Sequence, residues 1–184
     1  KRMYNEGENL SLDTPFAPGV LEAAYYSVGG SILAAREALA GNKVVNLLGG
    51  LHHAGPNFGG GFCIFADHAV AVRKLQKEGV IEKAMIFDLD AHAGNGTQEI
   101  FYGDPTVFNS SLHQDPRTLY PGTGFADQTG SGAGEGYTLN VPLPPKITGE
   151  EYLAELDEVL KLRNEYKPDL TFLILGVDTY KEDP

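Results

Sequence analysis

The 184-residue sequence lacks the features that mark several large classes of protein. It holds a single cysteine, Cys63, so no disulfide can form within the chain, which fits a reducing compartment. Lysine and arginine number 14 against 25 acidic residues, and the net charge of −11 argues against direct binding of nucleic acid. The longest apolar run, residues 170–177, is too short to span a membrane. We therefore expect a cytoplasmic protein, and its compact loops favour a prokaryotic source.

The elements that are present alternate between helices and short apolar strands. Helical patterns cover about residues 20–39, 66–77 and 97–101, and another helix follows a capping box that begins at Thr148. Runs typical of strands cover residues 44–48, 83–87, 106–113, 137–141 and 170–177. Such alternation favours right-handed crossovers between parallel strands. We therefore predict an α/β fold in three layers, with a mostly parallel central sheet flanked by helices.

Two acids and a histidine follow the apolar run 83–87 at alternate positions, namely Asp88, Asp90 and His92. Alternate residues of an extended chain lie on one side of it. A carboxylate and an imidazole two residues apart can bind one divalent cation, and the glycines of 94–96 then allow a sharp turn. The pattern indicates a metal site, although a solvated strand end followed by a helix cap is the simpler interpretation.

Two other predicted strands also end in polar residues. His52 and His53 come shortly after residues 44–48, and Asp178 directly follows residues 170–177. The carboxyl ends of parallel strands meet at one edge of a sheet, and α/β proteins bind their ligands at that edge. We therefore expect these groups to contribute to one site.

Several short motifs occur in a characteristic order between Asp13 and Pro184. They are Gly50-Leu51-His52-His53-Ala54, Gly60-Gly61-Phe62-Cys63, Asp88-Leu89-Asp90-Ala91-His92, Gly94-Asn95-Gly96-Thr97, Ser111-Leu112-His113, Tyr120-Pro121-Gly122-Thr123-Gly124, Asn140-Val141-Pro142-Leu143 and Gly176-Val177-Asp178. With them the chain resembles the zinc-dependent histone deacetylase family, which has the arginase/deacetylase fold. Ala93 stands where most members carry a second histidine, so the chain looks most like the class IV branch and its bacterial relatives.

The resemblance implies that Asp90, His92 and Asp178 hold Zn²⁺. Three protein ligands leave an open position for water and a substrate carbonyl. A set rich in carboxylates also suits Fe²⁺ or Mn²⁺, so the residues do not select the metal.

The resemblance also assigns roles to the two adjacent histidines. His53 would transfer protons and His52 would act electrostatically, with Asn95 orienting His53 and Asp88 orienting His52. Two histidines that merely cap a loop are the alternative.

Further residues match the substrate-binding positions of the family. Phe62 and Tyr120 correspond to the aromatic walls of an acyl-lysine tunnel, Gly61 lies in the same motif as Phe62, and Asp13 corresponds to an acid at the rim. A buried site for a monovalent cation, K⁺ or Na⁺, is also implied, and it comprises the Asp88 carbonyl with Asp90, His92, Ser111 and Leu112.

The family's catalytic tyrosine lies beyond the last zinc ligand, whereas this sequence ends at Pro184, and the family's first strand is expected before Lys1. We therefore expect residues 1–184 to be a single, partial catalytic domain, truncated at both ends. Loss of one oxyanion donor lowers turnover by about 100-fold to 1,000-fold, so this portion alone should be impaired.

The function implied is hydrolysis of the amide in an acetylated or longer-acylated lysine, or in a small acylated amine, by a metal-activated water and the histidine pair. The first alternative is a catalytically impaired module that binds a metal or acyl-lysine. The second is phosphoryl transfer of the haloacid-dehalogenase type, which Phe87-Asp88-Leu89-Asp90 resembles. The oligomeric state stays open.

Overall fold

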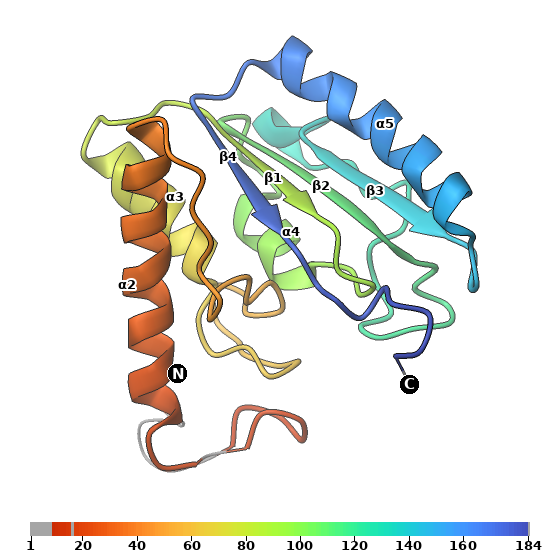
Figure 1. Cartoon of the computed structure of the whole chain (residues 1–184), viewed down its shortest axis with the longest axis horizontal. Coiled ribbons are helices and arrows are strands. Elements are labelled where there is room, and N and C mark those ends of the chain that lie inside the picture. Colours follow the sequence, from red (N-terminus) through yellow and green to blue (C-terminus); the bar gives the residue numbers. More distant parts are fainter. Residues whose placement is uncertain (1–8, 16, 184) are drawn as a thin grey trace. The chain divides into compact units, whose positions relative to one another are not determined.

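The computed structural model describes residues 9–15 and 17–183 (Figure 1). Its elements are α2 (Val20–Leu39), α3 (Asp67–Lys77), β1 (Ala84–Asp88), α4 (Asn95–Phe101), β2 (Val107–Gln114), the 3₁₀ helix η1 (Gly132–Gly134), β3 (Thr138–Leu143), α5 (Gly149–Tyr166) and β4 (Leu170–Ile174). The contacts group into two compact units. The first comprises residues up to Ile81 with Asn95–Ile100, and the second comprises Glu82–Gly94 with residues from Phe101 onward. That the whole chain is one partial domain stays a prediction.

The second unit is built on a parallel sheet, as predicted. Its strand order is β3-β2-β1-β4, and β1 pairs in parallel with both β2 and β4. All five residues of β1 are buried, which explains its nearly continuous apolar sequence. Its last residue, Asp88, stands opposite Ser111 of β2 and Ile174 of β4, so β1 and β4 end side by side, and β2 continues in the same direction to Gln114.

Helix α5 packs on this sheet. Its start is the predicted capping box, in which Thr148 Oγ1 accepts from the Glu151 amide and Glu151 Oε2 accepts from the Thr148 amide. Buried Val159 on the helix joins Met85 and Phe87 of β1 in one hydrophobic cluster. Helix α5 therefore closes one face of the sheet.

In the first unit, α2 packs against α3 through small side chains. The buried residues of α2 recur at helical spacing and are Ala24, Ser27, Ser31 and Ala35. Such a face lets neighbouring backbone come close, and a Cβ at Gly30 would lie only 3.0 Å from the Asn46 side chain.

The strand predicted over residues 44–48 is wrong, because this segment is irregular. A strand needs a neighbour in a ladder, and none of the described residues pairs with it. Side chains attach it to α2 instead, since Ser27 Oγ donates to the Leu48 carbonyl at 2.7 Å and Asn46 Nδ2 donates to the Ser27 carbonyl at 3.0 Å. The apolar Val45 and Leu47 are exposed by 77% and 96%.

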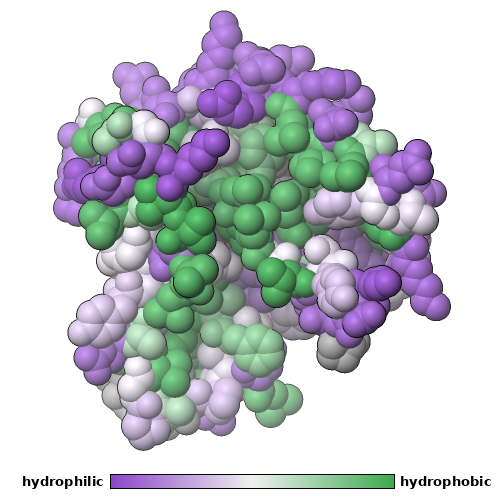
Figure 2. Space-filling view, viewed as in Figure 1, coloured by the Kyte–Doolittle hydropathy of each residue, from purple (hydrophilic) through white to green (hydrophobic). Residues whose placement is uncertain are grey.

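Strand β4 ends at Ile174, three residues earlier than the apolar run predicts, and it is an edge strand. Leu173, Leu175 and Val177 are exposed along it and beyond its end. Figure 2 shows hydrophobic surface in the region where Figure 1 draws β4. The described chain therefore presents an apolar edge here. Among the described helices, none combines the length and the apolar character needed to cross a membrane.

Candidate metal centre

Asp90, His92 and Asp178 converge in the second unit, with one ligand atom of each lying within 4.8 Å of the others. His92 Nδ1 is 3.0 Å from Asp90 Oδ1 and 2.9 Å from Asp178 Oδ2. The sheet explains this convergence. Asp90 and His92 follow β1, Asp178 follows β4, and the two strands are parallel neighbours.

Close backbone packing supports the cluster. A Cβ at Gly176 would lie 2.2 Å from Asp90 Oδ2 and 2.6 Å from Asp178 Oδ1, so a larger residue would push both carboxylates away. The Ala91 amide donates to Asp178 Oδ1 at 3.1 Å. Gly176 belongs to the motif that predicted Asp178, and the structure gives the physical reason for glycine at this position.

The electrostatics of the cluster favour a cation. Burial raises the pKa of Asp178, and the neighbouring charge of Asp90 raises it further. The hydrogen bond to Asp90 raises the pKa of His92, and the charge of Asp178 acts in the same direction. Two carboxylates that face each other therefore draw positive charge to the space between them.

The donor set also fits a metal by its spacing. Zinc binds imidazole nitrogen and carboxylate oxygen at about 2.0–2.2 Å, so tetrahedral ligand atoms stand about 3.3 Å apart. The contacts from His92 to the two carboxylates, at 2.9 and 3.0 Å, are close to this spacing. The cluster could therefore hold a divalent ion and leave one coordination position for another ligand.

Tyr120 lies beside this cluster, with its ring centroid 6.3 Å from that of His92 and 45% of its surface exposed. Two side chains, those of His113 and Gln128, hold the loop that follows Tyr120. His113 Nε2 is 2.8 Å from the Gly124 carbonyl, and Gln128 Oε1 accepts hydrogen bonds from Thr123 Oγ1, the Gly124 amide and the Phe125 amide. No local sequence pattern points to Gln128, because it lies in an irregular segment.

The residues predicted to bind a monovalent cation come from two paired strands and the segment after β1. Asp88 and Ser111 are buried and stand opposite each other, and Leu112 is buried next to Ser111. Ser111 Oγ lies 2.8 Å from His113 Nδ1. The ion-binding role of this group stays a prediction.

The predicted histidine pair lies in the first unit. His52 and His53 are buried, and their ring centroids are 4.0 Å apart. His53 Nδ1 is 2.7 Å from Asn95 Oδ1. Because an amide oxygen only accepts hydrogen bonds, Nδ1 carries the proton and the basic lone pair of His53 lies on Nε2. Asn95 is thus hydrogen-bonded to the ring that it is predicted to orient. Its role in orienting His53 and the pairing of Asp88 with His52 stay predictions.

Asp13, Gly61 and Phe62 meet in a turn of the first unit. The Gly61 amide donates to Asp13 Oδ1 at 3.0 Å, and the Phe62 amide donates to Thr14 Oγ1 at 3.0 Å. The hydrogen bond from Ser11 lowers the pKa of Asp13 despite the opposing effect of desolvation. Phe62 has a positive φ of 66° and is 79% exposed. Asp13 therefore holds the turn that presents Phe62, and its role at a substrate rim stays a prediction.

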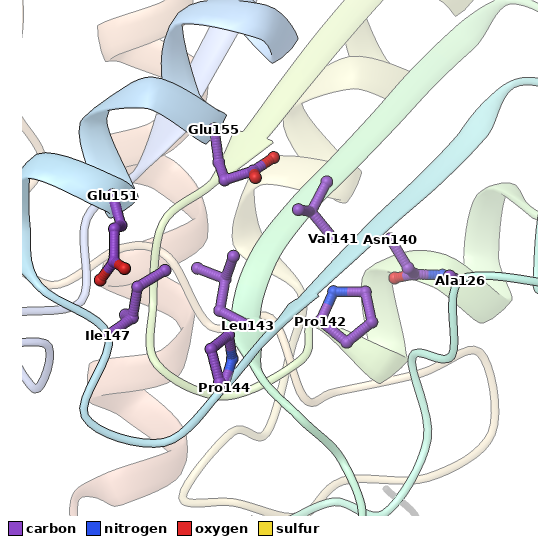
Figure 3. Close-up of a pocket in the computed structure, with 9 residues that line it drawn as sticks. All are labelled: Ala126, Asn140, Val141, Pro142, Leu143, Pro144, Ile147, Glu151 and Glu155. Atoms are coloured by element: carbon purple, nitrogen blue, oxygen red, sulfur yellow. The ribbon is translucent and has the colours of Figure 1, made fainter.

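A pocket of about 540 Å³ lies between β3 and the start of α5 (Figure 3). Its lining residues are Ala126, Asn140, Val141, Pro142, Leu143, Pro144, Ile147, Glu151 and Glu155. None of the predicted site residues is among them. Glu151, one of its two acids, is engaged in the capping box of α5.

Comparison with known proteins agrees with these features. A model of the Histone deacetylase domain matches residues 1–184. A probable deacetylase of Archaeoglobus fulgidus is 42% identical over 97% of this chain and 50% of its own length. Acetylpolyamine amidohydrolase 1 of Pseudomonas aeruginosa is 39% identical over 96% of this chain and 51% of its own. The chain thus spans about half the length of these curated relatives.

A solved structure of a homologue from Aquifex aeolicus shares the fold of this chain. It has a TM-score of 0.89 and 36% sequence identity, and the match covers 94% of this chain and 47% of that one. The α/β fold with a mostly parallel sheet, which the alternation of helices and strands predicts, is confirmed.

Proposed function

The chain belongs to the histone deacetylase family, and from this premise we propose that it forms part of a metal-dependent hydrolase that removes acyl groups from amines. The observation that carries the proposal is the convergence of Asp90, His92 and Asp178. Two relatives named as a probable deacetylase and an acetylpolyamine amidohydrolase support the same class of reaction.

In this proposal Asp90, His92 and Asp178 hold Zn²⁺, or else Fe²⁺ or Mn²⁺, which carboxylate ligands also suit. When bound, such an ion supplies a Lewis acid that polarises the acyl carbonyl and lowers the pKa of water. Gly176 leaves room for both carboxylates, and the Ala91 amide fixes Asp178.

His53 performs the proton transfers. Its hydrogen bond to Asn95 keeps the proton on Nδ1 and the lone pair on Nε2, which takes a proton from the attacking water. The resulting imidazolium then protonates the departing amine. His52 stabilises charge beside it, oriented by Asp88.

The substrate we propose is an acylated lysine side chain or a small acylated amine. Phe62 and Tyr120 are exposed aromatic residues that can flank an aliphatic chain. Asp13 contributes by holding the turn that carries Gly61 and Phe62. A net charge of −11 suits an amine-bearing substrate, and one relative is named for acetylated polyamines.

Two further features complete the proposal. A K⁺ or Na⁺ ion bound near Asp88 and Ser111 would offset negative charge behind the metal centre. The archaeal and bacterial relatives support a prokaryotic source, and the single cysteine supports a cytoplasmic location.

The test measures hydrolysis of three substrates by the Zn²⁺-loaded protein: an acetyl-lysine peptide, a matched myristoyl-lysine peptide and an acetylated diamine. Asp178→Asn removes one charged ligand with little change of shape, and Asp183→Asn is the control at an exposed carboxylate. Turnover that is lost only in Asp178→Asn supports the proposal, and the three rates define the acyl and amine specificity.

One bound ion per chain without turnover of any of the three substrates would overturn the claim that these residues suffice for hydrolysis. That result would leave the alternative of a module that binds a metal or acyl-lysine. Binding of the same acetyl-lysine peptide, measured by calorimetry, would then test that alternative directly.

A further inference from the structure

A buried carboxylate stands behind the loop that carries the histidine pair. Asp67, the first residue of α3, accepts a hydrogen bond from the Leu51 amide at 2.8 Å and one from the Gly50 amide at 3.2 Å. Ser31 Oγ of α2 donates to the same carboxylate. Because Gly50 and Leu51 directly precede His52, Asp67 fixes the backbone on the amino-terminal side of the pair.

The next residue reaches the same loop at another point. His68 is buried, and its Nε2 lies 2.8 Å from Thr97 Oγ1. Thr97 is fully buried, and its amide donates to the His52 carbonyl at 3.0 Å. His68 therefore supports, through Thr97, the backbone of His52 itself.

These two titratable side chains are unusual inside a core. His68 Nδ1 is 3.7 Å from Asp67 Oδ1 and has no hydrogen-bond partner in the part of the chain that the structure describes. Burial alone would raise the pKa of Asp67, but the His68 ring and the donors Ser31 and Leu51 hold it below 3.8. Burial of such groups costs free energy that apolar residues would not cost, so packing alone does not explain them.

We propose that Asp67 and His68 are positioning residues for the pair His52 and His53. Asp67 fixes the two amides before the pair, and His68, acting through Thr97, fixes the carbonyl of His52. Neither residue takes part in the chemistry. The inference rests on the proposed role of the pair, but the positions of the two rings can be measured without any turnover.

The decisive comparison is between Asp67→Asn and Ser31→Ala. An asparagine at 67 replaces one acceptor oxygen with a donor, so at least one of the Gly50 and Leu51 amides loses its partner. Ser31→Ala removes a hydrogen bond from the same buried carboxylate but leaves both loop amides bonded. The two variants therefore separate loss of loop support from general disturbance of the carboxylate.

We expect Asp67→Asn to lower kcat by about tenfold to a hundredfold, as when partners that orient reactive groups are lost, with KM and bound zinc unchanged. Ser31→Ala should keep kcat within about twofold, because both loop amides stay bonded. Hydrogen exchange of the Gly50 and Leu51 amides should accelerate only in Asp67→Asn, and only there should the imidazole NMR signals of His52 and His53 shift.

The pair Thr97→Val and Thr97→Ser tests the second contact by rescue. Valine matches threonine in shape but removes the hydroxyl that His68 contacts, while serine retains it. Thr97→Val should shift the His52 ring signals and lower kcat, and Thr97→Ser should restore both. These variants keep the inference testable if Asp67→Asn does not fold.

If Asp67→Asn and Ser31→Ala had the same kcat and the same imidazole NMR signals of His52 and His53, the positioning role of Asp67 would be overturned. Equal behaviour of Thr97→Val and Thr97→Ser would overturn the part played by His68. If the unaltered protein shows no turnover at all, residues 1–184 do not suffice for the proposed function, but the imidazole NMR signals and the amide exchange still decide the positioning inference.

Discussion

Replacement of Gly61 by alanine tests how tightly the histidine pair is packed. A Cβ at this position would lie 2.3 Å from His53 Cδ2, whereas ordinary contacts begin at 3.4 Å. The ring must therefore move by about 1 Å, which is enough to strain its 2.7 Å hydrogen bond to Asn95 and to misdirect Nε2. A misplacement of about 1 Å at a reacting group lowers the rate by about a hundredfold, and we expect this loss in kcat.

The same substitution also carries a backbone cost, because Gly61 has a φ of +53°. A residue with a Cβ loses about 1–2 kcal/mol in this left-handed region, and the free energy of unfolding should fall by at least that amount. Gly132→Ala is the matched control. Its φ is +56° and nothing lies within 4 Å of an added Cβ, so it carries the backbone cost without the clash.

The assay is steady-state hydrolysis of an acetyl-lysine peptide by both variants, together with denaturant unfolding and measurement of bound zinc. Gly132→Ala should lose only the backbone cost, Gly61→Ala should lose more stability because it also displaces the buried His53 ring, and only Gly61→Ala should lose turnover. If Gly61→Ala and Gly132→Ala kept the same kcat, either the clash with His53 would be absent or that ring would not take part in the reaction.

Three further predictions concern other parts of the chain. Asp178→Asn should weaken zinc binding by about a hundredfold or more, measured by calorimetry, because the ion loses a charged ligand, while Asp183→Asn should bind normally. Thr148→Ala should lower the free energy of unfolding by about 1 kcal/mol, measured in urea, because the capping box of α5 is lost. Asp67→Asn should flatten the dependence of stability on pH. The pKa of Asp67 is lowered in the folded protein, so its contribution is complete above 3.8 and is lost as the pH falls through the folded value.

Each of these predictions has a contrary outcome. Unchanged zinc affinity in Asp178→Asn would remove this residue from the metal centre. Wild-type stability of Thr148→Ala would mean that the start of α5 is held by packing alone. If the free energy of unfolding changed with pH in the same way for Asp67→Asn and the unaltered protein between about pH 2 and pH 5, the Asp67 carboxyl would titrate alike in the folded and the unfolded protein.

The parts of the structure that sequence patterns predicted are those governed by neighbours along the chain or by the rules of parallel sheets. Asp90 and His92 follow a fully buried strand at alternate positions, and Asp178 follows another apolar run. Parallel pairing of β1 with β4 then brings these residues together without further information. The capping box could also be predicted from the sequence, because its two partners, Thr148 and Glu151, lie within one helical turn.

The strand predicted over residues 44–48 is absent because a strand depends on residues that are distant in the sequence. The apolar residues on both sides of Asn46 favour a strand, but a strand also requires a partner, and no local pattern indicates whether one is present. In the described chain, Asn46 and Leu48 bond to α2 instead, at Ser27. Local propensity therefore could not predict the hydrogen bonding of this segment.

Asp67 is another residue whose contacts could not be predicted from the local sequence. An acid in the first turn of a helix is ordinary, since it favours the positive end of the helix dipole, and the sequence offers no reason to look further. Its partners Gly50 and Leu51 lie in another motif and meet it only because α3 packs behind the histidine loop. A motif search therefore finds the histidines that would do the chemistry and misses the carboxylate that holds their backbone, because the first are marked by local spacing and the second by burial alone.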